Sequence, residues 1–207
     1  MIKNIIFDLG NVVVCFDHDT VVSPFTNNPN EIEFLKTQVI PAIEWKKIDD
    51  GSITEEQAWQ SFKDRFNEDD YKLAVDFSQN WYKKHPLNSG AVEIAKKLKN
   101  QGFNLYVVSN IGTKCFEYIK EHNEEFFSMF DGLIISAKEK VRKPDPKIFE
   151  ILIDRYNIEP TETLLIDDDD TGRTFNTANQ MGINGCAVKK NDAQSILDLL
   201  KQYNIVV

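Results

Sequence analysis

Short runs of apolar, often β-branched residues recur along the chain, each bounded by polar residues or glycine. The first run covers 4–9 and includes Asp8 near its end. Comparable runs follow at 103–110, 132–136, 163–168 and 185–188. Continuous apolar runs of this length are typical of strands that are buried on both faces of a parallel sheet.

Segments with apolar residues at helical spacing lie between the later strands. They cover 91–102, 145–157 and 192–203, and the second begins with Asp145 as N-cap and Pro146 at the first helical position. Strands that alternate with helices indicate the α/β class. We therefore predict a Rossmann-like open parallel sheet with helices on both faces.

Residues 16–86 do not show this alternation of strands and helices, because they contain amphipathic stretches without a clear buried strand. The stretches cover 30–47, 53–66 and 71–84. Thr54 and Gln57 have the spacing of a capping box at a helix start. We predict a helical cap at 16–86, inserted into a catalytic α/β core formed by 1–15 and 87–207. The tryptophans of this segment, Trp45, Trp59 and Trp81, are expected to form the core of the cap.

Polar side chains follow the ends of the predicted strands. Asp8 ends the first strand, Ser109 and Asn110 end the second, four aspartates follow 163–166, and Lys143 precedes the helix that begins at 145. In open parallel sheets, ligands bind outside the carboxyl ends of the strands. We therefore expect these groups to converge on one edge.

These residue types fit phosphoryl transfer. A carboxylate that approaches a phosphate meets repulsion of about 4 kcal/mol at ~4 Å with an effective dielectric of ~20. Mg²⁺ between them would cancel this repulsion, and it prefers oxygen ligands. Asp168 would complete a carboxylate pair with Asp8, and Lys143 would add a fixed positive charge. The set predicts an aspartyl-phosphate that water hydrolyses.

The chain resembles the haloacid dehalogenase superfamily, in the branch with a helical cap after the first motif. The matching segments, in the family's order, are IIFDLGNVV, VVSN, VRKPDPKIF and LLIDDDD. They span nearly the whole chain, and the most similar members are sugar-phosphate phosphatases whose first motif also reads FDLGNV. The resemblance implies a phosphoric monoester hydrolase that acts on a small phosphorylated metabolite, with a sugar phosphate as one candidate.

By this resemblance, Asp8 is the nucleophile, and Lys143 pairs with Asp8 and with the phosphate. The Mg²⁺ ligands would be Asp8, the Gly10 carbonyl and Asp168, with Asp167 in support. Matching the following helix instead of the strand would favour Asp169 and Asp170. The implied phosphate-binding residues are Gly10, Asn11, Ser109, Asn110 and Lys143.

Gly10 departs from the family pattern, which has an acid–base aspartate at this position. Acid–base help is worth about 10²–10⁴ in rate. The chain would then favour substrates with good leaving groups, take the proton from Asp17, His18 or a cap residue, or catalyse weakly. The alternatives to a phosphatase are a metal-independent 2-haloacid dehalogenase and a non-catalytic or low-activity regulatory protein. The acidic run argues against the former, and the intact Asp8, Lys143 and Asp168 against the latter.

Charge and composition limit which binding partners and which location we expect. The net charge is −9 at pH 7 without a block of Lys and Arg, so we expect no nucleic-acid partner. Apolar runs stay below the ~18 residues of a membrane span. Cys15, Cys115 and Cys186 are far apart in sequence, which favours free thiols and a cytoplasmic location. We expect a monomer or a weak homodimer.

Overall fold

The computed structural model describes the backbone of residues 1–207 and the side chains of all of them except His18 and Thr20. Its strands form one sheet in the order β3-β2-β1-β4-β5, with every neighbouring pair parallel. This sheet confirms the predicted α/β, Rossmann-like class. The strands are β1 (Asn4–Phe7), β2 (Asn104–Ser109), β3 (Gly132–Ile135), β4 (Thr163–Asp167) and β5 (Asn184–Ala187).

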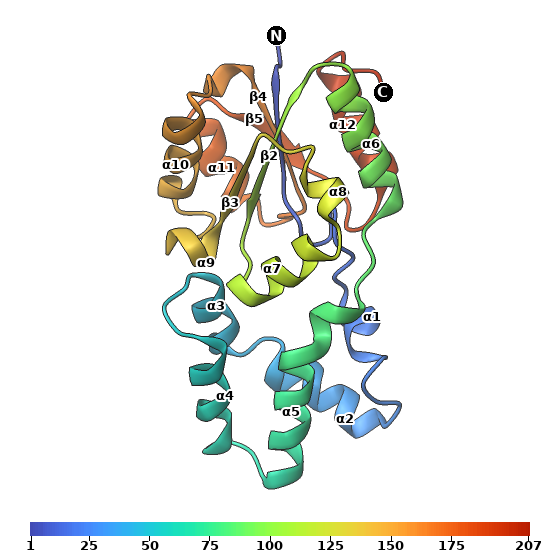
Figure 1. The fold of residues 1–207 in the computed structure, drawn as a ribbon, viewed down its shortest axis with the longest axis vertical. Coiled ribbons are helices and arrows are strands. Elements are labelled where there is room, and N and C mark those ends of the chain that lie inside the picture. The colour runs from blue at the N-terminus through green and yellow to red at the C-terminus, as the bar shows by residue number, and fades with distance from the viewer.

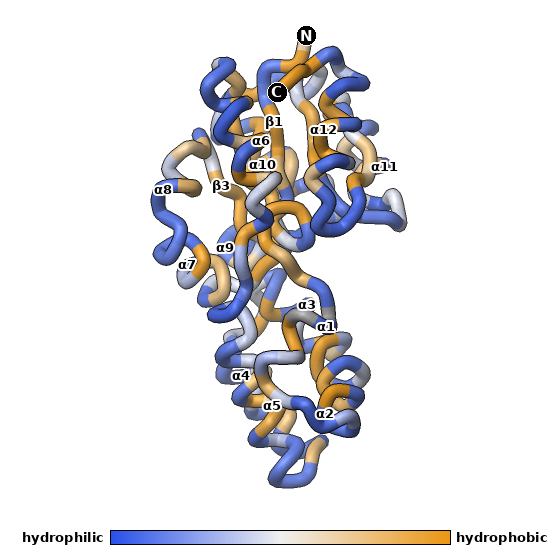
Figure 2. Tube along the Cα trace, turned by 90° about the vertical axis from the view of Figure 1, so that its right-hand side faces the viewer, coloured by the Kyte–Doolittle hydropathy of each residue, from blue (hydrophilic) through white to orange (hydrophobic). Residues whose placement is uncertain are grey.

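Helices cover both faces of the sheet, as Figure 1 shows. Side chains of the central strands alternate between two apolar clusters, so that Ile5 and Phe7 enter one and Ile6 enters the other. Figure 2 shows the result as hydrophobic strands inside and hydrophilic helix segments outside. One face carries α6 (Ser89–Asn100), α7 (Thr113–Glu121), α8 (Glu124–Phe127) and α12 (Ala193–Gln202); the other carries α9 (Ser136–Glu139), α10 (Pro146–Tyr156) and α11 (Arg173–Gln180).

A separate group of helices lies below the sheet in Figure 1. The predicted stretch 30–47 is broken at Pro41, because proline has no N–H to continue a helix. The capping box of Thr54 and Gln57 is present. The group consists of α1 (His18–Val22), α2 (Pro29–Phe34), a π-helical segment (Leu35–Val39), α3 (Ile43–Asp49), α4 (Glu55–Lys63), α5 (Glu68–Asn80) and a 3₁₀ turn (Trp81–Lys84).

The chain passes between the sheet and this helical group twice, and the two crossings are paired. Val14 forms an antiparallel bridge with Leu87, and the Asn88 N–H donates to the Val13 carbonyl at 2.7 Å. The domain boundaries at 15/16 and 86/87 stay a prediction. Among the described residues, no helix combines the length and apolar character needed to cross a membrane. Cys15, Cys115 and Cys186 are all free thiols.

Candidate active site

Asp8, Asp167 and Lys143 meet at the carboxyl edge of the sheet. β1 and β4 are neighbouring parallel strands, so their ends place Asp8 and Asp167 side by side. Lys143 precedes α10 and points its ammonium between them, with Nζ 2.9 Å from Asp8 Oδ1 and 2.5 Å from Asp167 Oδ2. All three side chains are buried.

Asp168 joins this group from the residue after β4. Ligand oxygens of Asp8, Asp167 and Asp168 lie within 4.8 Å of one another. Asn11, which has a left-handed φ of 56°, donates from Nδ2 to Asp168 Oδ2 at 3.0 Å. This bond orients the Asp168 carboxylate towards the other two.

The carboxylate oxygens of the cluster suit a divalent cation. Asp8 Oδ1 is buried, and its contact with the Lys143 ammonium at 2.9 Å leaves it room for a further ligand. Three carboxylates face one ammonium, which leaves an excess of negative charge. Mg²⁺ takes carboxylate oxygens and would remove that excess.

The pKa values of these groups reflect the same excess of negative charge. Burial raises the pKa of Asp8 to about 6, because Lys143 offsets it only in part and Asp167 adds repulsion. Burial also raises the pKa of Asp168, against the hydrogen bond from Asn11. Burial lowers the pKa of Lys143, but Asp167 and Asp8 outweigh it and raise that pKa above its usual value. The lysine therefore stays charged.

The residues predicted to bind phosphate lie around this cluster. Ser109 is buried at the end of β2, and Ser109, Asn110 and Gly10 line the same cavity. The Asn110 side chain accepts from the Lys143 N–H at 2.8 Å and donates to the Lys143 carbonyl at 3.0 Å. The Asn11 N–H donates to the Val14 carbonyl. In this structure the Asn110 and Asn11 side chains thus position Lys143 and Asp168, and their binding of phosphate stays a prediction.

Asp169 turns away from the cluster, towards the loop before α11. Its carboxylate accepts from the N–H groups of Thr171 at 3.0 Å and Thr174 at 2.7 Å. Although burial opposes ionisation, a hydrogen bond from the Thr171 hydroxyl and those from the two N–H groups lower the pKa of Asp169 to about 2. Of the four consecutive aspartates, the structure brings Asp167 and Asp168 to Asp8.

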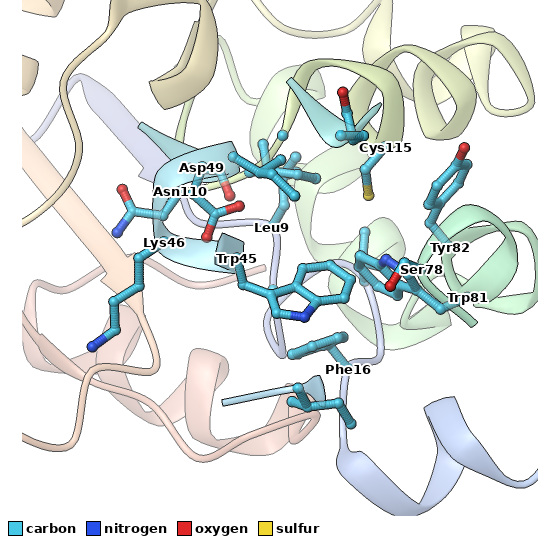
Figure 3. A pocket seen from close by; sticks show the side chains of 18 of the residues that line it. Leu9, Phe16, Trp45, Lys46, Asp49, Ser78, Trp81, Tyr82, Asn110 and Cys115 are labelled. Carbon is cyan, nitrogen blue, oxygen red and sulfur yellow. The ribbon is translucent and has the colours of Figure 1, made fainter. Parts of the chain in front are cut away.

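A cavity of about 450 Å³ extends from this edge into the helical group. Figure 3 shows Asp49, Lys46 and Asn110 towards one side of it and Phe16, Trp45, Trp81 and Tyr82 towards the other. Trp81 is part of the apolar core, as expected from the sequence, and it also lines the cavity with Trp45 and Trp59.

Asp49 and Arg142 are near the site although the sequence did not single them out for it. Asp49 ends α3, lines the cavity, and is close enough to Asp8 for the two charges to act on each other. Arg142 is partly buried, and its charge acts on Asp49. The Asp-Asp-Gly run at 49–51 is the sequence feature that could have pointed to Asp49. Of the predicted proton donors, the His18 side chain lies outside the described residues.

Known proteins place this arrangement in a family. The model of the haloacid dehalogenase-like hydrolases matches residues 2–175, which is most of the chain. The chain belongs to the haloacid dehalogenase-like hydrolases. Two relatives of this hydrolase are the sesquiterpene phosphatase astK of Aspergillus oryzae, 25% identical over 80% of both chains, and the D-ribitol-5-phosphate phosphatase of Bacteroides thetaiotaomicron, 24% identical over 81% of this chain and 84% of the relative.

Solved structures share the fold of this hydrolase. A haloacid dehalogenase family enzyme of Bacteroides thetaiotaomicron, in complex with magnesium and inorganic phosphate, is 20% identical with a TM-score of 0.72, over 93% of this chain and 96% of that chain. The L-2-haloacid dehalogenase of Xanthobacter autotrophicus is 20% identical with a TM-score of 0.66, over 91% and 78%. At these identities, the likeness concerns the fold.

Proposed function

We propose that this hydrolase cleaves a small phosphate monoester through an aspartyl-phosphate on Asp8, with Mg²⁺ bound beside it. The observation that carries the proposal is the cluster of Asp8, Asp167 and Asp168, in which the first two are buried against the Lys143 ammonium and the third is half-buried. Mg²⁺, with Asp8, Asp168 and the Gly10 carbonyl as ligands and Asp167 in support, would neutralise the charge that keeps a phosphate from the carboxylate.

The chain's own residues then have definite roles. The Asp8 carboxylate attacks phosphorus, and the bond from phosphorus to the organic oxygen breaks. The Lys143 ammonium stabilises the charge on the transferring group, while Ser109 and the loop at Asn110 donate hydrogen bonds to its oxygens. Water attacks the phosphorus of the aspartyl-phosphate next, which releases phosphate and restores Asp8.

The relatives support phosphate monoesters as the substrate class. One is a phosphatase of sesquiterpenes and another a phosphatase of D-ribitol 5-phosphate, so their names leave the organic group open between a terpenoid and a sugar. The fold of an L-2-haloacid dehalogenase is also similar, with a TM-score of 0.66. A metal-independent dehalogenase, however, has no use for three clustered carboxylates, and chloride release from 2-chloropropionate would be its signature.

Phosphate release from acetyl phosphate and p-nitrophenyl phosphate tests the proposal. We expect activity with Mg²⁺, none with EDTA, and a loss of about 10³-fold or more in Asp8→Asn, which lacks the nucleophile. Asp198→Asn, an exposed carboxylate on α12, is the matched control and should keep full activity. Full activity of Asp8→Asn, or activity that EDTA leaves unchanged, would overturn the proposal.

A further inference from the structure

We propose that the organic group of the substrate is largely apolar, a terpenoid, alkyl or aryl group that enters the cavity between the sheet edge and the cap helices. This inference rests on the proposed phosphatase function. The cavity, of about 450 Å³, reaches from Gly10, Ser109 and Asn110 past α3, α4 and α5. Its volume lies within the range of small-molecule sites, ~300–1,000 Å³.

Aromatic side chains form the walls that lie away from the sheet edge. The Trp81 ring centroid is 5.0 Å from that of Phe16 and 5.6 Å from that of Trp45, and both contacts are edge-to-face. Such contacts fix the rings against one another. The walls are thus shaped before a ligand arrives. The aromatic lining residues are Phe16, Trp45, Trp59, Phe77, Trp81 and Tyr82.

A polyol would find few hydrogen-bond partners against these walls. Each hydroxyl left without a partner would lower affinity by about 5- to 150-fold. The indole N–H groups of Trp45 and Trp59 are buried and donate to no acceptor among the described residues. With Ser78 Oγ, which is also buried and unpartnered among the described residues, and the Glu55 carboxylate, they could serve isolated oxygen atoms. The aromatic faces themselves offer no acceptors for a row of hydroxyls.

Three of the polar lining residues lie towards the catalytic end. Asp49, Asn110 and Lys46 are grouped on one side of the cavity in Figure 3, and the labelled aromatic rings lie on the other. Asn110 follows β2, at the sheet edge where Asp8 lies. This polarity matches a substrate with a phosphate head and an apolar body.

A series of ethyl, butyl, hexyl and octyl phosphates, assayed with Mg²⁺ beside D-ribitol 5-phosphate, tests the substrate class. We expect kcat/KM to rise by up to about fourfold per methylene. D-Ribitol 5-phosphate should fall at least 100-fold below octyl phosphate. A flat series, or a preference for D-ribitol 5-phosphate, would overturn this inference alone. Failure to hydrolyse even acetyl phosphate would instead overturn the proposed function.

Ser78→Phe adds a structural test, because Ser78 is buried on α5 and lines the cavity. Filling the cavity should lower the ratio of kcat/KM for octyl over ethyl phosphate at least tenfold. Ser128→Phe, exposed at the C-cap of α8, should leave that ratio unchanged. Because Ser78→Phe could fail to fold, Ala42→Leu provides the same test at another lining residue. An unchanged ratio in the folded variant contradicts the inference.

Gly10 carries a second, independent inference, since it leaves open space beside the nucleophile. A Cβ at Gly10 would meet no atom within 4 Å, and the residue is outside the left-handed φ region. Asp49 lines the same cavity from the cap. We infer that Asp49 supplies the acid–base group of the reaction in place of a side chain at position 10.

Contacts with the core position Asp49. The Gly112 N–H donates to its carboxylate, and Ser136 Oγ donates to its carbonyl. The charged groups that face the carboxyl are Arg142, Asp50 and Asp8. Burial raises the pKa of Asp49 to about 7, against the opposing charge of Arg142. An acid that titrates near neutral pH can both give and take a proton during turnover.

The proton transfers balance over the two steps. As Asp8 attacks and the bond from phosphorus to the organic oxygen breaks, the Asp49 carboxyl gives its proton to that oxygen, and the alcohol leaves. The Asp49 carboxylate then takes a proton from water while the water oxygen attacks the aspartyl-phosphate. Cleavage of the bond from phosphorus to Asp8 releases phosphate, and Asp49 is protonated again.

Asp49→Asn tests this role, because asparagine keeps an acceptor for the Gly112 N–H but cannot give up a proton. We expect kcat/KM for octyl phosphate to fall about 10²–10⁴-fold. For acetyl phosphate, whose leaving group needs no proton, it should change less than threefold. Equal losses on both substrates, or no loss on octyl phosphate, would overturn the role.

Adding Gly10→Asp to Asp49→Asn provides the rescue. A Cβ at Gly10 meets no atom within 4 Å, so a side chain can be introduced there, two residues after Asp8. The double variant should regain at least tenfold in kcat/KM on octyl phosphate relative to Asp49→Asn. If Asp49→Asn misfolds, Asp49→Ser provides the same test. Asp49→Ser should steepen the dependence of kcat/KM on leaving-group pKa across aryl phosphates, and an unchanged slope would contradict an acid at Asp49.

Discussion

At Asp8, burial and the neighbouring carboxylates oppose ionisation, and Lys143 favours it. A site that binds a cation has to keep such groups close together before the cation arrives. The folded chain therefore carries a repulsion in its metal-free form that Mg²⁺ would relieve. This view gives two predictions at the scale of single residues.

Asp8→Asn should stabilise the metal-free protein at pH 8. Removing a buried charge whose pKa is raised from 3.8 to about 6 should add about 1–3 kcal/mol to the free energy of unfolding. Thermal unfolding in EDTA measures it, with Asp198→Asn as the exposed control. The same variant should show a smaller rise in Tm on addition of Mg²⁺. A lower Tm in EDTA would contradict the prediction.

Lys143→Met should have the opposite effect. Asp8 and Asp167 would lose the ammonium that lies 2.9 and 2.5 Å from them, and unpaired buried charges cost about 3–5 kcal/mol. Urea unfolding at pH 8 in EDTA would show the loss. Lys201→Met, exposed on α12, should stay within about 0.5 kcal/mol of the native protein. A Lys143 variant as stable as this control would argue against the buried ion pairs.

Among the secondary-structure elements, the contact between the end of α3 and α9 decides where Asp49 lies. Gly51, two residues after Asp49, has a φ of 69°, and a Cβ there would lie 2.3 Å from the Ala137 carbonyl oxygen. Only glycine allows this approach without displacement of one element. Ser136, next to Ala137, donates to the Asp49 carbonyl. The loop after α3 is thus attached to the core at adjacent positions.

Gly51→Ala should displace this loop and lower kcat/KM on octyl phosphate about tenfold, because Asp49 would move with it. Gly102→Ala is a matched control, since Gly102 has a φ of 89° but open space around its Cβ. Both variants should lose about 1–2 kcal/mol of stability through backbone strain. Only Gly51→Ala should lose activity, and equal activities would show that the close approach is unimportant.

For the molecule as a whole, the raised pKa values of Asp8 and Asp49 determine how stability depends on pH. Both groups have a pKa of 3.8 when unfolded and about 6 and about 7 when folded. Between these values the folded chain binds more protons than the unfolded chain, so the free energy of unfolding falls as pH rises. This contribution of the two carboxyls is fully present below pH 3.8 and lost above about 7.

Mg²⁺ should reverse that trend, because it binds the ionised carboxylates. At a free concentration 100 times its Kd, it would add about 2.7 kcal/mol, or roughly 5–10 °C in Tm. Thermal unfolding from pH 5 to 8, in EDTA and in Mg²⁺, measures both effects. The Mg²⁺-induced rise in Tm should be larger at pH 8 than at pH 5. A rise that is independent of pH would contradict a site built on titrating carboxylates.

The sequence by itself determined the sheet and the group at its edge. Buried parallel strands appear as short apolar runs, and parallel strands end on the same side. The residues at their carboxyl ends, Asp8, Ser109 and Asp167, therefore meet whatever the conformation of the loops. Local hydrogen bonds were equally predictable, as the N-cap at Asp145 and the capping box at Thr54 show, because their partners lie within three residues.

Only the tertiary structure decided what faces this edge. Asp49 is 41 positions from Asp8 in sequence and lies on a helix whose pattern shows just its apolar face. Its approach depends on packing against Gly112 and α9, which no local pattern encodes. The aromatic cavity has the same origin: Trp45, Trp59 and Trp81 belong to three different elements and meet only when those elements pack. Contacts between distant segments are set by the whole fold, and they decide which substrate the edge can accept.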